Sequence, residues 1–238
     1  MKDMNMFIKN YIAHRGLYTN DIPENSLEAF LNATNNGYDI EFDLQLSKDN
    51  KIVVFHDDSL LRMCGVKKRI DALTYTELKQ FKLNNTSATI PLFTDVLDAL
   101  PKSTNLMIEL KTGSKNRRLV ALFLDTIKRY NFNYIVQSFD PRLVHMIKKN
   151  APTIARGYIT KNNHLNCKII SFFIKLLPIH TWIKPDYYVY KITDLPNKRM
   201  DKMNKKGVLV FSYTATSKEE LESIRDRYDN AVFEGFRP

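Results

Sequence analysis

Eight short runs of β-branched and aromatic residues alternate with helical stretches along this chain, and this alternation most constrains its fold. The runs are Tyr11–His14, Asp39–Leu44, Leu106–Leu110, Tyr134–Ser138, Ile154–Ile159, Tyr187–Tyr190, Val208–Tyr213 and Ala231–Phe233. The helical patterns between them include Ser26–Asn36, Arg117–Tyr130, Pro141–Asn150 and Ser217–Tyr228. Strands that alternate with helices form parallel βα units. Eight such units in 238 residues predict an α/β fold, a (β/α)8 TIM barrel, with residues 1–238 as a single domain.

A ninth apolar run, Lys51–Phe55, does not fit this alternation. Only four residues separate it from the run that begins at Asp39 and continues to Leu46, whereas a parallel crossover needs about a dozen residues. We therefore predict a hairpin extension after the second strand, which returns His56 to the rim where that strand ends. Residues 58–104 form a small inserted subregion before the third strand, with helices predicted at Thr74–Lys82 and Thr94–Leu100.

Acidic residues interrupt two of the apolar runs. Glu41 and Asp43 lie two residues apart, so they face the same side of their strand, and Glu109 lies in the same way two residues before Lys111. Three carboxylates inside one barrel repel each other unless a cation lies between them. Oxygen ligands favour Mg²⁺, Ca²⁺ or Mn²⁺ over zinc. The alternative is a salt-bridge cluster closed by Lys111 or Arg15.

Two histidines end strand-like runs close to these carboxylates. His14 is followed by Arg15, and His56 ends the hairpin return. Imidazoles titrate near neutral pH, and the planar guanidinium group matches a phosphate. With a cation, these groups are the parts that a phosphodiester hydrolase needs. Histidines without such neighbours are interpreted as surface or core residues: His145, His164 and His180.

Six short motifs carry a family resemblance. They are His14-Arg15-Gly16, Glu24-Asn25-Ser26 followed by Ala29-Phe30, Glu41-Phe42-Asp43, Ser47-Lys48-Asp49, His56-Asp57 and Glu109-Leu110-Lys111. In this order they resemble the glycerophosphodiester phosphodiesterase family, densely over residues 11–58, again at 106–111, and more weakly at Gln137-Ser138-Phe139. The resemblance implies a (β/α)8 barrel, dependence on one divalent cation (Mg²⁺, Ca²⁺ or Mn²⁺), and hydrolysis of glycerophosphodiesters to sn-glycerol 3-phosphate and an alcohol.

The resemblance also implies roles for the matching residues. The metal ligands would be Glu41, Asp43 and Glu109, the acid/base pair His14 and His56, the phosphate-binding residues Arg15 and Lys111, and the supporting carboxylate Glu24. It does not say which histidine is the acid and which the base. Asn25 and Ser26 have a simpler role available, because Asn25 with Glu28 three residues later is like a capping box, and we predict that this pair caps the following helix.

The late part of the chain departs from the family pattern. Residues 210–214 and 233–238 lack the family's usual motifs on its last two strands. An aromatic platform for the substrate is predicted at Phe211 or Tyr213. Two alternatives to a soluble-substrate enzyme stay open: a lysophospholipase D-like activity on lipids, or a non-catalytic barrel that binds a phosphate-bearing lipid or a polyglycerolphosphate polymer. We expect no nucleic-acid partner, because no nucleic-acid motif is present.

The charge of the chain is concentrated on one flank. Of the 36 Lys and Arg residues, 14 fall in residues 141–210, which contain only 3 Asp and Glu. This flank therefore has a net charge of +11, whereas the whole chain has +10 and the remaining residues sum to −1. This flank is either a solvated basic face or a surface for anionic membrane or polymer. It contains Ile169–Leu177, part of a nearly all-apolar helical pattern over 163–184, which is either buried against the barrel or open to lipid or to a second subunit. The oligomeric state stays open.

The cysteines and the N-terminus bear on location. Cys64 and Cys167 are too few for a disulfide framework and lack zinc-site spacing, so two free thiols are expected. No apolar secretion signal precedes Tyr11, and no run reaches the roughly 20 apolar residues of a membrane span. These features predict a cytoplasmic protein, with association at the membrane periphery left open.

Overall fold

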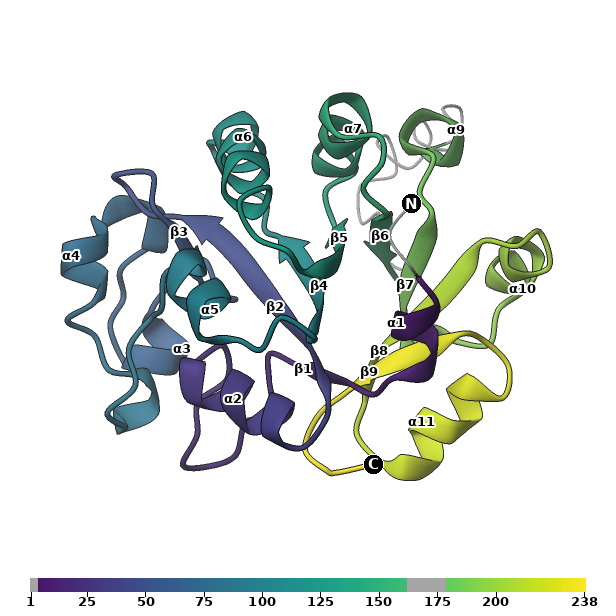
Figure 1. The fold of residues 1–238 in the computed structure, drawn as a ribbon, viewed down its shortest axis with the longest axis horizontal. Helices are drawn as coiled ribbons and strands as arrows, with labels where there is room; N and C mark the ends of the chain where they lie inside the picture. The colour runs from purple at the N-terminus through teal and green to yellow at the C-terminus, as the bar shows by residue number, and fades with distance from the viewer. Residues whose placement is uncertain (1–3, 162–178) are drawn as a thin grey trace.

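The computed structural model describes residues 4–161 and 179–238, and its parallel strands close into a barrel with helices outside it (Figure 1). The barrel strands are β1 (Ile12–His14), β2 (Asp39–Leu46), β4 (Asn105–Leu110), β5 (Asn133–Ser138), β6 (Arg156–Thr160), β7 (Tyr187–Lys191), β8 (Leu209–Ala215) and β9 (Asn230–Phe233). β1 pairs in parallel with β2 on one side and with β9 on the other, which closes the barrel. The predicted (β/α)8 fold is confirmed.

The helices follow the predicted alternation. They are α1 (Asn5–Lys9), α2 (Leu27–Asn35), α3 (Leu61–Cys64), α4 (Tyr75–Leu78), α5 (Phe93–Ala99), α6 (Asn116–Ile127), α7 (Pro141–Asn150), α9 (Ile179–Ile183), α10 (Lys198–Asn204) and α11 (Lys218–Arg225), with 3-10 turns at η1 (Ile70–Ala72), η2 (Leu83–Asn85) and η3 (Ile192–Asp194). The apolar run Ile169–Leu177 lies outside the described residues. In the part of the chain that the structure describes, no helix combines the length and the apolar character of a membrane span.

The ninth apolar run is the predicted hairpin return. β3 (Ile52–Val54) pairs antiparallel with β2, with Val54 opposite Leu44. The chain then makes an excursion through α3, α4 and α5, which lie together on the left of Figure 1. The first part of this excursion packs around its own apolar cluster, formed by Val53, Phe55, Leu60, Met63, Ile70, Leu73, Leu78, Leu83, Ala88 and Ile90. The hairpin and this cluster fix the position of the loop that carries His56.

Helix α1 closes the end of the barrel where β9 begins. Phe7 is fully buried and packs against inward-facing strand residues, in a cluster of Phe7, Ile12, Met107, Ile135, Ala155, Ile159, Tyr187, Val189, Phe211 and Val232. Asn230 Nδ2, where β9 begins, donates to the carbonyl oxygens of Phe7 and Asn10, each at 2.7 Å. Segments from both ends of the chain therefore close this end of the barrel together.

Replacing Phe7 by alanine is expected to lower the free energy of unfolding by about 3–5 kcal/mol, because it leaves a cavity in a close-packed interior. Urea denaturation followed by circular dichroism measures this change. Met6→Ala is the matched control, since the neighbouring Met6 side chain is 39% exposed and should cost little. If Phe7→Ala lowered the free energy of unfolding as little as Met6→Ala does, α1 would not contribute to the core.

Candidate active site

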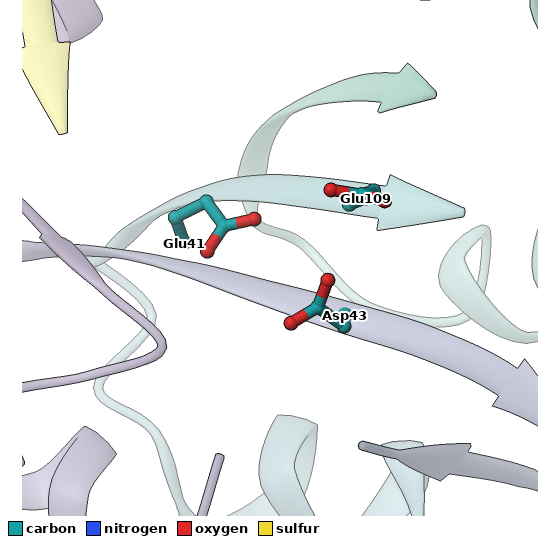
Figure 2. Close-up of side chains that lie close together, drawn as sticks. All are labelled: Glu41, Asp43 and Glu109. Carbon is teal, nitrogen blue, oxygen red and sulfur yellow. The ribbon is translucent and has the colours of Figure 1, made fainter. Parts of the chain in front are cut away.

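Three carboxylates from two neighbouring strands lie close together (Figure 2). Glu41 and Asp43 project from β2 and Glu109 from the adjacent β4, where Asp43 and Glu109 are register partners. One oxygen from each residue lies within 4.8 Å of the others, and the residues are only 3%, 1% and 6% exposed. The strand alternation that predicted a common inward face therefore brings all three together. A buried set of carboxylate oxygens fits a hard divalent cation such as Mg²⁺, Ca²⁺ or Mn²⁺.

The three carboxylates have different electrostatic surroundings. Burial, together with the charges of Asp43 and Glu109, raises the pKa of Glu41 well above its usual value. Burial also raises the pKa of Glu109 to about 7, although Lys111 opposes this shift. Burial acts on Asp43 in the same direction, but the cations Lys111 and Arg15 outweigh it and hold the pKa of that carboxyl below its usual range. Negative charge at the site is thus incompletely compensated by the protein, which favours the binding of a cation.

Two cationic side chains border the carboxylates. Lys111 Nζ lies 2.8 Å from Glu109 Oε1 and 3.4 Å from Asp43 Oδ1. Arg15 Nε lies 3.4 Å from Asp43 Oδ2 and is buried without a hydrogen-bond partner. Salt bridges to Lys111 and Arg15, the alternative considered from the sequence, therefore reach Asp43 and Glu109. Among the described ion pairs, Glu41 has only His14, at 3.9 Å.

The loop after β1 has an unusual backbone that places Arg15. Arg15 and Gly16 both have positive φ, at 56° and 81°. A side chain at Gly16 would meet the backbone of Ala29 at 2.7 Å, so α2 packs directly on this turn. The turn directs the Arg15 peptide N–H toward Glu41 Oε2, at 3.3 Å, while Arg15 Nη1 donates to Glu24 Oε1 at 2.7 Å. Only glycine fits the contact with Ala29, which explains the glycine that follows Arg15.

The capping prediction for Asn25 is wrong, although Ser26 does cap α2. Ser26 Oγ accepts from Ala29 N–H at 3.1 Å. Asn25 has φ of 54° and turns its side chain into the barrel, where its Nδ2 donates to Asp43 Oδ2 at 3.0 Å. The Asp43 N–H donates back to Asn25 Oδ1 at 3.4 Å. Asn25 therefore orients a site carboxylate, a role that its position before a helix concealed.

His14 forms a pair with a carboxylate from the far end of the chain. Its Nδ1 lies 2.5 Å from Glu234 Oε2, directly after β9, and its Nε2 faces Glu41. The Tyr18 hydroxyl donates to the same Glu234 oxygen at 3.0 Å. The hydrogen bond from His14 lowers the pKa of Glu234. Glu234 is a site residue that the sequence analysis did not identify, and its only signal was an acidic residue at the end of the last strand.

His56 is oriented in the same way by its neighbour in the sequence. Its Nδ1 lies 2.6 Å from Asp57 Oδ1. Gln45 Nε2 donates to the carbonyl oxygens of Phe55 and Asp57, at 2.8 and 2.9 Å, and so holds the backbone on both sides of His56. Burial lowers the pKa of His56, and the nearby Lys111 and Arg15 add to this shift against the opposing charge of Asp43. The imidazole is therefore biased toward its neutral form.

A cavity of about 580 Å³ opens onto most of these groups, but Asp43 and Lys111 are not among its lining residues. The predicted site residues that line it are His14, Arg15, Glu24, Glu41, His56, Glu109 and Tyr213. Tyr213 meets Phe139 edge to face, with ring centroids 5.7 Å apart, and forms an aromatic wall. Gln137 also lines the cavity, and its buried Oε1 has no hydrogen-bond partner. Phe211 lies one inward position deeper on β8, is fully buried in the cluster around Phe7 and does not reach the cavity.

The chain is similar to known proteins over most of its length. Residues 14–233 match the model of the glycerophosphoryl diester phosphodiesterase family. A glycerophosphodiester phosphodiesterase of Caldanaerobacter subterraneus is 28% identical over 90% of this chain and 88% of its own, and human lysophospholipase D is 31% identical over 54% of this chain and 44% of its own. The crystal structure of a Thermotoga maritima glycerophosphodiester phosphodiesterase aligns with a TM-score of 0.74 at 26% identity, over 94% of this chain and 93% of its own. The chain therefore belongs to the glycerophosphoryl diester phosphodiesterase family and is a phosphodiester hydrolase.

Proposed function

We propose that this protein hydrolyses glycerophosphodiesters to sn-glycerol 3-phosphate and an alcohol, with one divalent cation and a pair of histidines. The observation that carries the proposal is that His14 and His56 line one cavity together with Glu41 and Glu109, two members of the buried cluster of three carboxylates. Each imidazole has its Nδ1 at a carboxylate, which leaves Nε2 available for proton transfer. A barrel that only binds a phosphate would have no need for this combination.

Each residue has a defined part in the proposed reaction. Glu41, Asp43 and Glu109 would hold the cation, which would draw charge from the phosphoryl oxygens. Arg15 and Lys111 supply positive charge to the same oxygens, and Glu24 fixes the Arg15 guanidinium through its 2.7 Å contact. One histidine removes a proton from the attacking water or glycerol 2-hydroxyl while a new P–O bond forms, and the other donates a proton to the leaving alkoxide. If the 2-hydroxyl attacks, the product is a cyclic 1,2-phosphate, which a water molecule then opens to glycerol 3-phosphate with the two histidines in exchanged roles. Tyr213 forms the wall beside the glycerol or the alcohol group.

A lysophospholipase D-like activity is the second candidate. Its support is the human lysophospholipase D, which is 31% identical over 142 residues. The cavity also has apolar surface from Phe139, Ile159, Val189 and Tyr213 beside its charged groups. A lysophospholipid contains the same glycerophosphodiester bond, so the same catalytic residues would act on it.

The basic flank, residues 141–210, is a surface by which the protein could associate with an anionic partner. In its described part, α10 carries the exposed side chains of Lys198 and Lys202, and Lys205 and Lys206 follow it. Such a surface would attract an anionic membrane or a polyglycerolphosphate polymer. We also propose a cytoplasmic location, because a sequence with only two cysteines has no need of an oxidising compartment. We include peripheral association with such a surface in the proposal.

A substrate panel tests the proposed reaction. Glycerophosphocholine, glycerophosphoethanolamine, glycerophosphoglycerol and lysophosphatidylcholine are assayed with Mg²⁺, Ca²⁺ and Mn²⁺. Glycerol 3-phosphate from the three soluble diesters is measured by a coupled dehydrogenase, and choline from lysophosphatidylcholine, whose other product is lysophosphatidic acid, by a coupled oxidase. We expect cation-dependent release of glycerol 3-phosphate from at least one soluble diester. Release of choline from the lysophospholipid alone would support the second candidate. Absence of both products with every substrate and cation would contradict both.

A further inference from the structure

Arg62 connects two parts of the site that come from different loops. It lies on α3 in the inserted subregion, directly beyond the loop that carries His56. Its Nε and Nη2 donate to Asp57 at 2.6 and 3.2 Å. Its Nη1 and Nη2 donate to Glu24 at 2.8 and 2.7 Å. One guanidinium group thus engages both oxygens of two carboxylates.

Each of these carboxylates holds a residue that faces the phosphate in the proposed reaction. Asp57 Oδ1 accepts from His56 Nδ1 at 2.6 Å. Glu24 Oε1 accepts from Arg15 Nη1 at 2.7 Å. The result is a continuous chain of hydrogen bonds from His56 through Asp57, Arg62 and Glu24 to Arg15. A rigid planar fork is suited to this arrangement, because it fixes the directions of both carboxylates at once.

We propose that Arg62 is a positioning residue that sets the distance and the relative orientation of His56 and Arg15. This inference rests on the roles proposed above for those two residues. Arg62 itself does not line the cavity, and its side chain is 47% exposed. Exposed ion pairs contribute little to stability, so the four hydrogen bonds are better explained by geometry than by stabilisation of the fold.

Arg62 also determines the net charge beside His56. The guanidinium group is the main cause that lowers the pKa of Asp57 against the effect of burial. Without Arg62, the Asp57 carboxylate would carry an uncompensated negative charge next to the imidazole. That charge stabilises the imidazolium form, so the pKa of His56 would rise. The other charged groups that act on His56, which are Asp43, Lys111 and Arg15, remain in place.

The test compares Arg62→Gln and Arg62→Lys with the wild-type protein. We expect Arg62→Gln to lower kcat by about 10- to 100-fold, as for other residues that orient active-site groups, with a smaller change in KM. In its pH–rate profile, the limb that reports the ionisation of His56 should lie at higher pH than in the wild-type profile. Arg62→Lys should restore only part of the activity, because an ammonium group cannot engage both carboxylates in a bidentate manner.

Arg69→Gln is the matched control from the same subregion. Arg69 makes a bidentate pair with Asp71, at 2.9 and 3.1 Å, and is similarly exposed, but it contacts no residue of the proposed site. It should leave kcat and the pH profile unchanged. Wild-type kcat and an unshifted pH profile in Arg62→Gln, with or without a lower Tm, would overturn the inference.

A second measurement does not require activity. The pKa of the His56 ring is followed by NMR in the metal-free wild-type protein and in Arg62→Gln, with the signal assigned through His56→Gln. A higher pKa in Arg62→Gln supports the inference, and an unchanged pKa contradicts it. If the wild-type protein released no glycerol 3-phosphate, the proposed function would fail, whereas the NMR result would still decide the role of Arg62.

Discussion

Replacing either His14 or His56 by alanine is expected to lower kcat by about 10²- to 10⁴-fold, the usual contribution of a general acid or base. Both side chains line the cavity, and each has Nδ1 against a carboxylate: Glu234 at 2.5 Å for His14 and Asp57 at 2.6 Å for His56. If the two histidines act in the same turnover, removal of both should cost much less than the product of the two single effects. Initial rates on a soluble glycerophosphodiester measure all three variants.

His145→Ala is the control for this experiment. His145 lies on α7, where its ring stacks on Trp182 at 4.8 Å, and it is not part of the cavity lining. Its replacement should leave kcat unchanged. Circular dichroism and Tm show whether each variant is folded. Near wild-type activity in a folded His14→Ala or His56→Ala protein would sink the two-histidine mechanism.

Glu41→Gln is expected to abolish cation binding and to reduce activity by about 10³-fold or more, because a catalytic cation contributes several kcal/mol to the barrier. The substitution keeps the shape of the side chain and removes one of the three carboxylate ligands. Isothermal titration with Mg²⁺, Ca²⁺ and Mn²⁺ measures binding. In the wild-type protein, a cation at 100 times its Kd should also stabilise the fold by about 2.7 kcal/mol, and this increment should vanish in Glu41→Gln.

The same variant distinguishes a metal site from a salt-bridge cluster. Glu41 has the weakest protein cation contacts of the three carboxylates, and its neighbours Asp43 and Glu109 oppose its ionisation. Without metal, Glu41→Gln should therefore be at least as stable as the wild type. Glu28→Gln, an exposed change on α2, is the control. Activity of the wild type that survives EDTA and equals that of Glu41→Gln would show that the cluster is structural.

The fold and the carboxylates could be predicted because they follow from periodicity. In a strand, residues two apart share a face, so Glu41 and Asp43 had to face the same way. The four-residue gap before the predicted run Lys51–Phe55 excluded a parallel crossover and so placed His56 at the rim. The same two-residue periodicity did not distinguish Tyr213 from Phe211. It predicts which face of a strand a side chain lies on, but not how deep in the barrel the side chain lies.

The residues that orient the site could not be predicted from local patterns. Asn25 reaches Asp43 only because its backbone adopts a positive φ, whereas its position before a helix favours capping. Glu234 meets His14 across 220 residues, a contact that depends on closure of the barrel. Arg62 lies in an irregular excursion, where periodicity says nothing about the direction of a side chain. Such contacts are set by tertiary structure.

The separate apolar cluster of the excursion has a consequence for the dynamics of the enzyme. Phe55, next to His56, belongs to that cluster and not to the main core of the barrel. Proteins open in cooperative units, and a small unit has a lower opening free energy than the whole fold. We therefore expect this subregion to open, and to displace His56, more readily than the barrel wall that holds the carboxylates. Activity should then be lost under milder conditions than the fold of the barrel.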